Sequence, residues 1–411
     1  MQVVAMGAAG DMGRTAARHL ATNGAISEPL LADLDVARAE MLAGSLAGTA
    51  SGRVRATVCD VLDDRTARRV LDSADLVLNC SGPLFRLGIP TLRAAIDTTT
   101  MYLEICDDPD PTIEMLRLDE DARVAGLASV VGMGASPGIS NLLALRAARR
   151  LDHVRDCFTG WSLDDSRDGP GDGGDGGDGG DGEEQGLVRA DGAPSGAVVH
   201  FMEQIHGAVS VVEDGVLVRR PPLDAIELEY PGLGRGTGYV VGHPEAVTLL
   251  GSLGLSGRSC SLVVVRDGST AAFLRGLRSD LDDGDLDLDR AARALLRPSA
   301  MRSARAAVAG VALRGGGSLP PLFAWASGTA DGRPATVGCH VTAMPRGMAG
   351  ATAIPAALAA AQLLADRPRP GVHAPEAVID ADRLLTELIP FCTTPVDDLE
   401  SLAPLHVAVE V

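Results

Sequence analysis

The chain begins with the stretch MQVVAMGAAGDMG, residues 1–13. An apolar strand pattern runs directly into a glycine turn, and a helical pattern follows it. Such a turn presents backbone N–H groups and the positive end of a helix dipole to a pyrophosphate. Gly7 permits the tight turn, Gly10 lets phosphates approach the backbone, and Gly13 lets the helix pack closely on the strand. The residues expected to contact a dinucleotide in this turn are Gly7, Ala9, Gly10, Asp11, Met12 and Gly13.

A second strand pattern ends at Asp33, and its carboxylate bears on the choice of cofactor. An acid about 20 residues after the glycine turn accepts hydrogen bonds from the adenosine ribose of NAD. Leu34 and Asp35 follow it, so no arginine stands there to receive a 2′-phosphate. We therefore expect NAD as the cofactor, with NADP as the alternative. The other interpretation of Asp33 is a solvated acid at a strand end.

Strand and helix patterns alternate through the first third of the chain. Further apolar strands are predicted at 54–60, 75–80, 102–106 and 129–132. This order predicts an α/β fold, in which an N-terminal Rossmann-type doubly wound parallel sheet carries an inserted α+β domain. Ligands bind beyond the carboxyl ends of the strands in such sheets. Further cofactor contacts are therefore expected at Asp60, Cys80, Ser81, Gly82, Pro83, Ser136 and Pro137.

Composition and pattern divide the chain into three parts. We expect a nucleotide-binding domain at 1–133, an α+β substrate and dimerisation domain at 134–345, and a helical return onto the first domain at 346–411. Within the middle part, residues 198–218 alternate as strands do. The segment 168–186 is almost wholly glycine and acid, which predicts a disordered loop. Its period of three and its lack of apolar anchors argue against a calcium-binding repeat.

The composition excludes several classes of function. All 36 basic residues are arginine, so mechanisms that need a lysine Schiff base, a Walker lysine or a Tyr-x-x-x-Lys pair are impossible. A net charge of −19 argues against nucleic acid or an anionic membrane as a partner. Seven cysteines without CxxC spacing indicate neither a disulfide framework nor a zinc site, and we expect no metal and a cytoplasmic location.

Four stretches together resemble the saccharopine dehydrogenase-like family of nicotinamide oxidoreductases. They are 7–13, 79–83, the run GASPGISNLLA at 134–144, and GVHAPE at 371–376. Within that family the pattern is most similar to lysine 6-dehydrogenase. The resemblance implies NAD(P)-linked oxidation or reduction at the C–N bond of an amino acid or a secondary amine. The lysine–histidine pair associated with fungal saccharopine-oxidising members cannot be carried over, because this chain has no lysine.

Candidate side chains for the chemistry stand near the predicted strand ends and in the inserted domain. The candidates for holding an ammonium or moving a proton are Glu104, His206 and His243. The candidates for binding the substrate are Arg346, Arg235 and Asn141, since arginine binds a carboxylate bidentately and asparagine orients an amide or carboxylate. Each candidate also has a structural alternative. Glu104 can cap a helix, the two histidines can be structural, the two arginines can form ion pairs, and Asn141 can satisfy the N-terminus of a helix.

Three functional hypotheses remain open from the sequence. The first is an NAD(P)-dependent dehydrogenase or reductase acting on CH–NH or CH–NH2 donors. The second is a biosynthetic imine reductase of polyamine or specialised metabolism, and the third is a non-catalytic NAD-binding protein. In each case we expect a small-molecule ligand, no nucleic acid, no membrane and a homodimer. Fold alone cannot decide among them, because function depends on the site.

Overall fold

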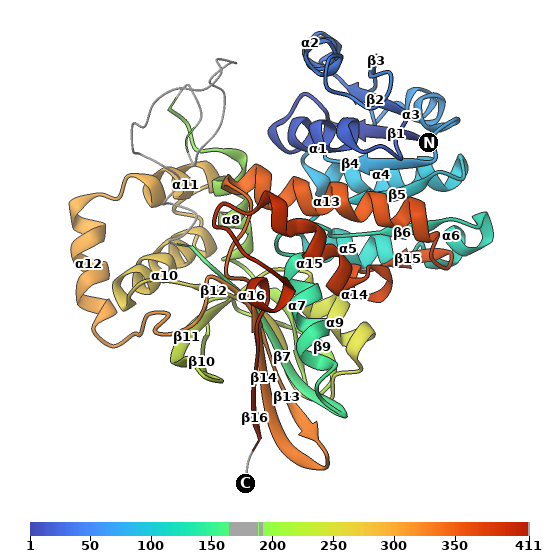
Figure 1. The fold of residues 1–411 in the computed structure, drawn as a ribbon. Coiled ribbons are helices and arrows are strands. Elements are labelled where there is room, and N and C mark those ends of the chain that lie inside the picture. The colour runs from blue at the N-terminus through green and yellow to red at the C-terminus, as the bar shows by residue number, and fades with distance from the viewer. Residues whose placement is uncertain (164–187, 189–191, 410–411) are drawn as a thin grey trace. The chain divides into compact units, whose positions relative to one another are not determined.

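The computed structural model describes residues 1–163, 188 and 192–409. The glycine-rich acidic segment predicted at 168–186 lies outside these residues. The described chain forms two compact units (Figure 1). The first unit comprises Met1–Leu145 and Thr342–Pro404, and the second comprises Arg146–Val341 and the C-terminal residues from Leu405. A discontinuous first unit with an inserted second unit is the architecture that the sequence predicts.

The first unit is built on a seven-stranded sheet with the order β15-β6-β5-β4-β1-β2-β3. Every pairing in it is parallel. The strands are β1 (Gln2–Met6), β2 (Glu28–Asp33), β3 (Arg55–Val58), β4 (Leu76–Asn79), β5 (Met101–Glu104), β6 (Ala128–Val130) and β15 (Gly371–His373). The strand order reverses at β1, which lies between β2 and β4, and this switch point is where doubly wound sheets bind ligands. The predicted fold class is confirmed.

Helices accompany this sheet in the first unit, into which α7 reaches as far as Leu145, and the C-terminal part of the chain supplies several of them. They are α1 (Asp11–Thr22), α2 (Val36–Leu46), α3 (Asp64–Leu71), α4 (Leu84–Asp97), α5 (Pro109–Leu116), α6 (Asp119–Ala125), α7 (Ile139–Ala148), α13 (Gly347–Asp366), α14 (Pro375–Val378), α15 (Ala381–Leu388), the 3₁₀ turn η1 (Ile389–Phe391) and α16 (Leu399–Leu402). Helix α13 packs against α1, and its buried alanines permit a close approach. Among the described residues, α13 alone is long and apolar enough to span a membrane, a test that a buried core helix also passes.

Strand β15 was not predicted, although its residues belong to a motif that the sequence analysis singled out. Gly371 and His373 align with Ala128 and Val130 of β6 in a parallel pair. The Val372 N–H also donates to Asp119 Oδ1 at 3.0 Å. A strand of three residues is too short to show a period of two, and only its pairing with β6 defines it.

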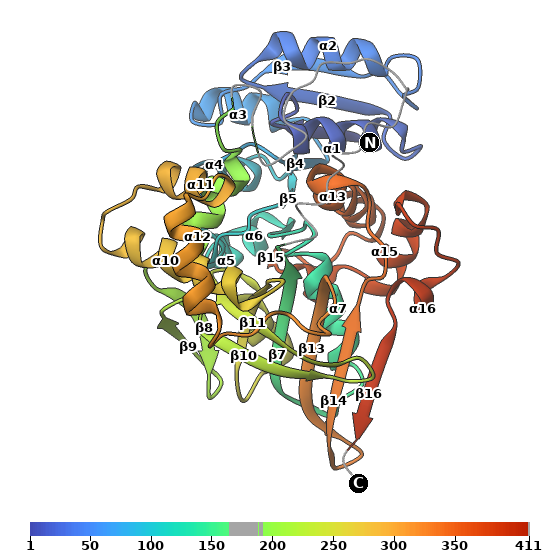
Figure 2. The ribbon, with the colours of Figure 1, turned by 90° about the vertical axis from the view of Figure 1, so that its left-hand side faces the viewer.

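The second unit contains a nine-stranded mixed sheet with the main order β10-β11-β12-β7-β13-β14-β16, while β8 pairs with β12 and β9. Figure 2 shows β7, β13, β14 and β16 running side by side. Its strands are β7 (His153–Ser162), β8 (Val209–Glu213), β9 (Val216–Arg220), β10 (Ala225–Tyr230), β11 (Gly234–Val241), β12 (Ser259–Val264), β13 (Leu322–Ala330), β14 (Arg333–His340) and β16 (Leu405–Val409). Its helices are α8 (Gly196–Gln204), α9 (Glu245–Leu253), α10 (Gly268–Asp282), α11 (Leu288–Leu296) and α12 (Ala300–Gly310).

Two expectations about the second unit are wrong. Residues 198–218 do not all form strands, because 196–204 are the helix α8, which buries Val198, Phe201 and Met202 at helical spacing. The chain from 346 onward is not wholly a return to the first unit, because β16 pairs with β14 in the second sheet. Hydrogen bonding to that sheet edge decides the place of β16, and no local pattern encodes it.

The boundary after the nucleotide-binding region also differs from 133. Residues 134–145 belong to the first unit. The reason is local: the Met133 N–H donates to the Glu104 carbonyl at 2.8 Å, and the Gly134 N–H donates to the Pro137 carbonyl at 2.8 Å. The turn after β6 therefore folds back onto the end of β5.

Candidate functional site: the carboxyl edge of the parallel sheet

The glycine turn after β1 contains glycines of two kinds. Gly7 has φ +76°, and a Cβ there would lie 2.6 Å from the Ser81 nitrogen. A Cβ on Gly13 would lie 2.0 Å from the Gly7 carbonyl oxygen. Packing within the protein therefore requires glycine at both positions. A Cβ on Gly10 would meet no protein atom closer than the Gly7 oxygen at 3.5 Å, so the protein itself tolerates a side chain there.

Helix α1 begins at this turn without a side-chain cap. Its N-cap residue is Gly10, whereas α2 and α3 are capped by the carboxylates of Asp35 and Asp63. Asp11 lies in the first turn of α1 and forms an ion pair with Arg14, which offsets its negative charge. An uncapped helix start with an exposed glycine is suited to a pyrophosphate, since the first N–H groups remain available to phosphate oxygens. The residues present thus fit a dinucleotide.

Asp33 ties the end of β2 to the glycine turn. Its Oδ2 accepts from the Ala9 N–H at 2.8 Å, and its Oδ1 accepts from the Asp35 N–H at 2.9 Å. Each carboxylate oxygen keeps a second lone pair, so Asp33 can brace the turn and accept a ribose hydroxyl as well. Asp60, after β3, is exposed and accepts from the Leu62 N–H at 2.9 Å.

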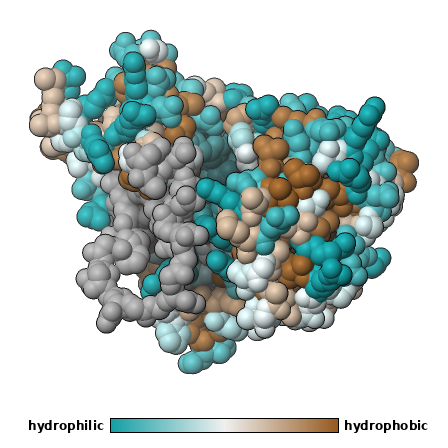
Figure 3. Space-filling model, turned by 90° about the horizontal axis from the view of Figure 1, so that it is seen from above, coloured by the Kyte–Doolittle hydropathy of each residue, from teal (hydrophilic) through white to brown (hydrophobic). Residues whose placement is uncertain are grey.

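Apolar side chains are exposed near these acids. Leu34 is 70% exposed and Leu62 is 47% exposed, although both follow strands of a well-buried sheet. Figure 3 shows one face of the molecule, on which hydrophobic residues form clusters among hydrophilic ones. Leu34 directly follows Asp33, and Leu62 lies two residues after Asp60.

The loop after β4 is organised by a buried asparagine. Asn79 is fully buried; its Oδ1 accepts from the Ser81 N–H at 3.0 Å and from the Ser81 hydroxyl, and its Nδ2 donates to the Tyr102 hydroxyl oxygen at 3.3 Å. Burial raises the pKa of the Cys80 thiol to about 12, so this thiol is protonated at neutral pH. Gly82 and Pro83 lead into α4, which has Pro83 as its N-cap and likewise no side-chain cap.

Glu104 lies at the end of β5 and is fully buried. Its Oε1 accepts from the Gly132 N–H at 2.7 Å, and its Oε2 accepts from the Cys106 N–H. Burial raises the pKa of Glu104 to about 8, against the lowering effect of these two donors. In this structure Glu104 braces two loops across neighbouring strand ends. The predicted role in proton transfer stays a prediction.

The turn after β6 is joined to a distant part of the chain. The Gly138 N–H donates to Asn141 Oδ1 at 2.9 Å, and Asn141 Nδ2 donates to Glu376 Oε2 at 2.9 Å. Asn141 is fully buried and Glu376 is 6% exposed. The two motifs at 134–144 and 371–376 therefore meet in space. The role of Glu376 escaped the sequence analysis, although the motif that contains it did not.

The two predicted catalytic histidines belong to the second unit. His243 is 4% exposed, and its Nδ1 lies 3.3 Å from Oε2 of the fully buried Glu245. The Ser261 hydroxyl donates to that same Glu245 oxygen at 3.0 Å. His206 is partly exposed, with its Nδ1 3.7 Å from Asp282 Oδ1. Glu245 is a partner that the sequence analysis missed, although it lies two residues from His243.

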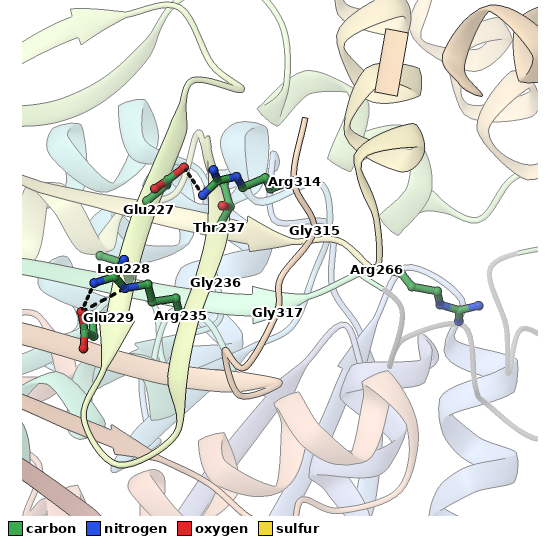
Figure 4. A pocket seen from close by; sticks show the side chains of 10 residues that line it. All are labelled: Glu227, Leu228, Glu229, Arg235, Gly236, Thr237, Arg266, Arg314, Gly315 and Gly317. Atoms are coloured by element: carbon green, nitrogen blue, oxygen red, sulfur yellow. Dashed lines mark hydrogen bonds and ion pairs between the residues drawn. The ribbon is translucent and has the colours of Figure 1, made fainter. Parts of the chain in front are cut away.

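The two candidate arginines differ in their surroundings. Arg235, in the second unit, is highly exposed and forms an ion pair with Glu229 on the neighbouring strand, with Nη2 and Oε2 2.9 Å apart. Figure 4 shows this pair beside a second one, Arg314–Glu227, along a groove of about 560 Å³. Arg346, in the first unit, is exposed at the N-cap of α13 and forms no ion pair within the described part of the chain. Arg235 already has a carboxylate partner, so Arg346 remains the stronger candidate for a substrate carboxylate.

Comparisons with known proteins agree with this geometry. A family model described as the saccharopine dehydrogenase NADP binding domain matches residues 3–130. A saccharopine dehydrogenase-like oxidoreductase from Rattus norvegicus is 34% identical over 61 residues, which cover 15% of this chain and 14% of that protein. The apo structure of saccharopine dehydrogenase (L-Glu forming) from Saccharomyces cerevisiae matches with a TM-score of 0.59 and 16% identity, covering 100% of both chains. That last likeness shows a shared fold.

The uncapped glycine turn, Asp33 and the parallel sheet define a dinucleotide-binding protein of the Rossmann class, which uses a nicotinamide cofactor. Residues 3–130 match the family model of the saccharopine dehydrogenase NADP binding domain, and the chain shares the fold of saccharopine dehydrogenase. These findings support the family resemblance that the sequence predicts. The finer likeness to lysine 6-dehydrogenase stays a prediction.

Proposed function

We propose that this protein transfers a hydride between a nicotinamide cofactor and the carbon of a C–N bond in an amino acid or a secondary amine. The observation that carries the proposal is the glycine turn, in which Gly10 alone is not required by the protein's own packing. The bound nicotinamide would supply the redox chemistry. In the oxidative direction the amine loses a hydride and a proton to become an imine, and water then releases a carbonyl compound together with ammonia, from a primary amine, or an amine, from a secondary one.

The side chains at the sheet edge would position these partners. The start of α1 binds the pyrophosphate, and Asp33 accepts from the adenosine ribose. Ser81 and Pro137, in the loops after β4 and β6, and Glu104, at the end of β5, lie toward the nicotinamide end, because a dinucleotide crosses the switch point at β1. The exposed guanidinium of Arg346 is the proposed partner of a substrate carboxylate, to which it can donate two parallel hydrogen bonds.

A substrate panel tests the proposal. Saccharopine, L-lysine and related amino acids are offered with each oxidised cofactor, and carbonyl compounds plus amines are offered with each reduced cofactor, while the nicotinamide absorbance is followed. Oxidation of an amino acid at its C–N bond supports the proposal. Turnover confined to the reductive reactions of non-amino-acid imines would favour a biosynthetic imine reductase. Tight cofactor binding without turnover across the panel would indicate a non-catalytic protein.

The choice between NAD and NADP is a separate question. The sequence favoured NAD because of Asp33 and Asp35, whereas the family description names NADP. Two structural features weaken the argument for NAD. Asp33 is engaged with backbone N–H groups, and the Arg38 guanidinium lies 3.4 Å from Asp35 and offsets its charge. We propose that the protein accepts NADP, and that Asp33 limits how well it does so.

Asp33→Asn is therefore expected to raise the ratio of kcat/KM for NADP to that for NAD by about tenfold, since one unit of negative charge leaves the 2′-phosphate region. Asp35→Asn removes the same charge while asparagine still caps α2, and it should shift the ratio less, because the Arg38 guanidinium already offsets the charge of Asp35. Steady-state kinetics with both cofactors measure the ratio; direct binding of both reduced cofactors replaces kinetics if no substrate is found. An unchanged ratio in the Asp33 variant would show that this carboxylate does not face the 2′ position.

A further inference from the structure

The turn 134–138 after β6 is fixed by hydrogen bonds within the turn and by contacts on both of its sides. The Gly134 N–H donates to the Pro137 carbonyl at 2.8 Å, and the Ile139 N–H donates to the Gly134 carbonyl at 3.0 Å. Gly138 has φ +119°, and a Cβ there would lie 2.2 Å from the Gly134 oxygen. The backbone of this turn therefore has a single well-defined path, which presents Ser136 and Pro137 at the carboxyl edge of the sheet.

On one side, Pro137 packs against Gly132. A Cβ on Gly132 would lie 2.9 Å from Pro137 Cγ, so the ring occupies the space that a side chain would need. The Gly132 N–H in turn donates to Glu104 Oε1. This side of the turn is thus fixed to the end of β5.

On the other side, Asn141 connects the turn to Glu376. Asn141 uses both ends of its amide: the oxygen accepts from Gly138 N–H, and the nitrogen donates to the Glu376 carboxylate. Glu376 lies on α14, directly after β15, and the Val131 N–H donates to the His373 carbonyl of β15 at 2.9 Å. The carboxylate accepts only, so it fixes the direction of the amide and keeps the Asn141 oxygen toward Gly138.

We infer that Asn141 and Glu376 form a positioning pair, which fixes the Ser136–Gly138 turn against the nicotinamide end of the bound cofactor; this inference rests on the proposed function. Strand β6 lies on the opposite side of β1 from β2, where the adenosine half binds. The pair therefore affects the nicotinamide half of the cofactor and not the adenosine half.

Reversal of the hydrogen bond between the two side chains tests the pair. In Asn141→Asp, one carboxylate oxygen still accepts from Gly138, but the other faces the Glu376 carboxylate in a buried place, where two like charges repel strongly. In Glu376→Gln, the new amide oxygen still accepts from Asn141. In the double variant, the amide introduced on α14 donates to the carboxylate introduced on α7, so the hydrogen bond between the two side chains is restored with its direction reversed.

Glu114→Gln, at an exposed position on α5, is the control for loss of a carboxylate.

The readouts are the dissociation constants of NADPH, from its fluorescence, and of 2′-phospho-ADP-ribose, which lacks the nicotinamide ring. We expect Asn141→Asp to weaken NADPH binding at least about tenfold and 2′-phospho-ADP-ribose binding less than about twofold. Glu376→Gln should stay within about threefold of the wild type, and the double variant should recover NADPH binding to within about threefold.

Two kinds of failure are distinguishable. If the wild type binds neither NADPH nor 2′-phospho-ADP-ribose, nor the NAD counterparts NADH and ADP-ribose, the proposed function fails and the inference with it. If the wild type binds them but the double variant is no better than Asn141→Asp, the pair does not position the turn. Equal weakening of both probes in Asn141→Asp, in step with a lower melting temperature, would likewise overturn the inference and assign the pair a purely structural role.

Discussion

Replacing Gly10 with valine is expected to weaken NAD(P)H binding at least about a hundredfold while the protein remains folded. The folded state should tolerate the change because a Cβ at this position meets the Gly7 oxygen at 3.5 Å, an ordinary contact distance. Gly10 has φ −77° and ψ 165°, which valine adopts readily. Its branched side chain would occupy the path of the pyrophosphate and separate the phosphate oxygens from the N–H groups of α1. A hundredfold loss corresponds to about 2.7 kcal/mol, which is the scale of a few charge-assisted hydrogen bonds.

The matched control for this experiment is Gly44→Val. Gly44 lies in α2 of the same unit, and a Cβ there meets no atom within 4 Å. Calorimetry measures the affinity of both variants, and circular dichroism and thermal melting report whether each is folded. Gly7 and Gly13 are unsuitable for this test, because their substitution disturbs the protein itself. Wild-type affinity in a folded Gly10→Val protein would exclude this turn as the pyrophosphate site.

Glu104 is expected to make the protein less stable as the pH rises from about 5 to about 8. Burial raises the pKa of this carboxyl group to about 8 in the folded chain, whereas its ordinary value is 4.5. Between these two values the unfolded chain has lost the proton and the folded chain retains it, so the free energy of unfolding falls as the pH rises. The difference between the folded and unfolded pKa values sets an upper limit of roughly 5 kcal/mol on this loss of unfolding free energy. Below pH 4.5 both states are protonated, and the effect disappears.

The variant Glu104→Gln should lack this contribution, since an amide does not titrate. We expect the unfolding free energy of the wild type to fall relative to that of the variant from about pH 5 to about pH 8, as measured by urea denaturation at several pH values. Glu114→Gln, at an exposed site, should follow the wild type throughout. Parallel curves for wild type and Glu104→Gln would mean that Glu104 is ionised across this range, stabilised by the Gly132 and Cys106 N–H groups.

Much of the first unit could be predicted from its sequence, because the signals there are local. Apolar strands, amphipathic helices and a glycine turn follow one another within residues 1–133, and each is visible in a short window. The nucleotide-binding class followed from these patterns, whereas the family resemblance also used the motifs at 134–144 and 371–376. Asp33 was correctly placed at a strand end, although its bonds to Ala9 and Asp35 required the structure.

The roles of the individual polar side chains were less predictable. Glu104 was proposed as a proton carrier from its position at a strand end, but the structure shows it buried with two backbone donors. Arg235 was proposed as a carboxylate-binding residue, and the antiparallel register of β10 and β11 places Glu229 opposite it. A side chain's partners come from strand pairing and burial, which its chain neighbours do not specify.

The sequence by itself determined the alternating fold of the first unit, the glycine turn and the exclusion of lysine chemistry, because each depends on residue type and short spacing. Only the tertiary structure decided that β16 pairs with β14, that β15 extends the parallel sheet, and that Asn141 meets Glu376 across 235 residues of chain. Such contacts form when the chain closes long loops to satisfy buried hydrogen-bonding groups. No local periodicity records which distant partner satisfies them.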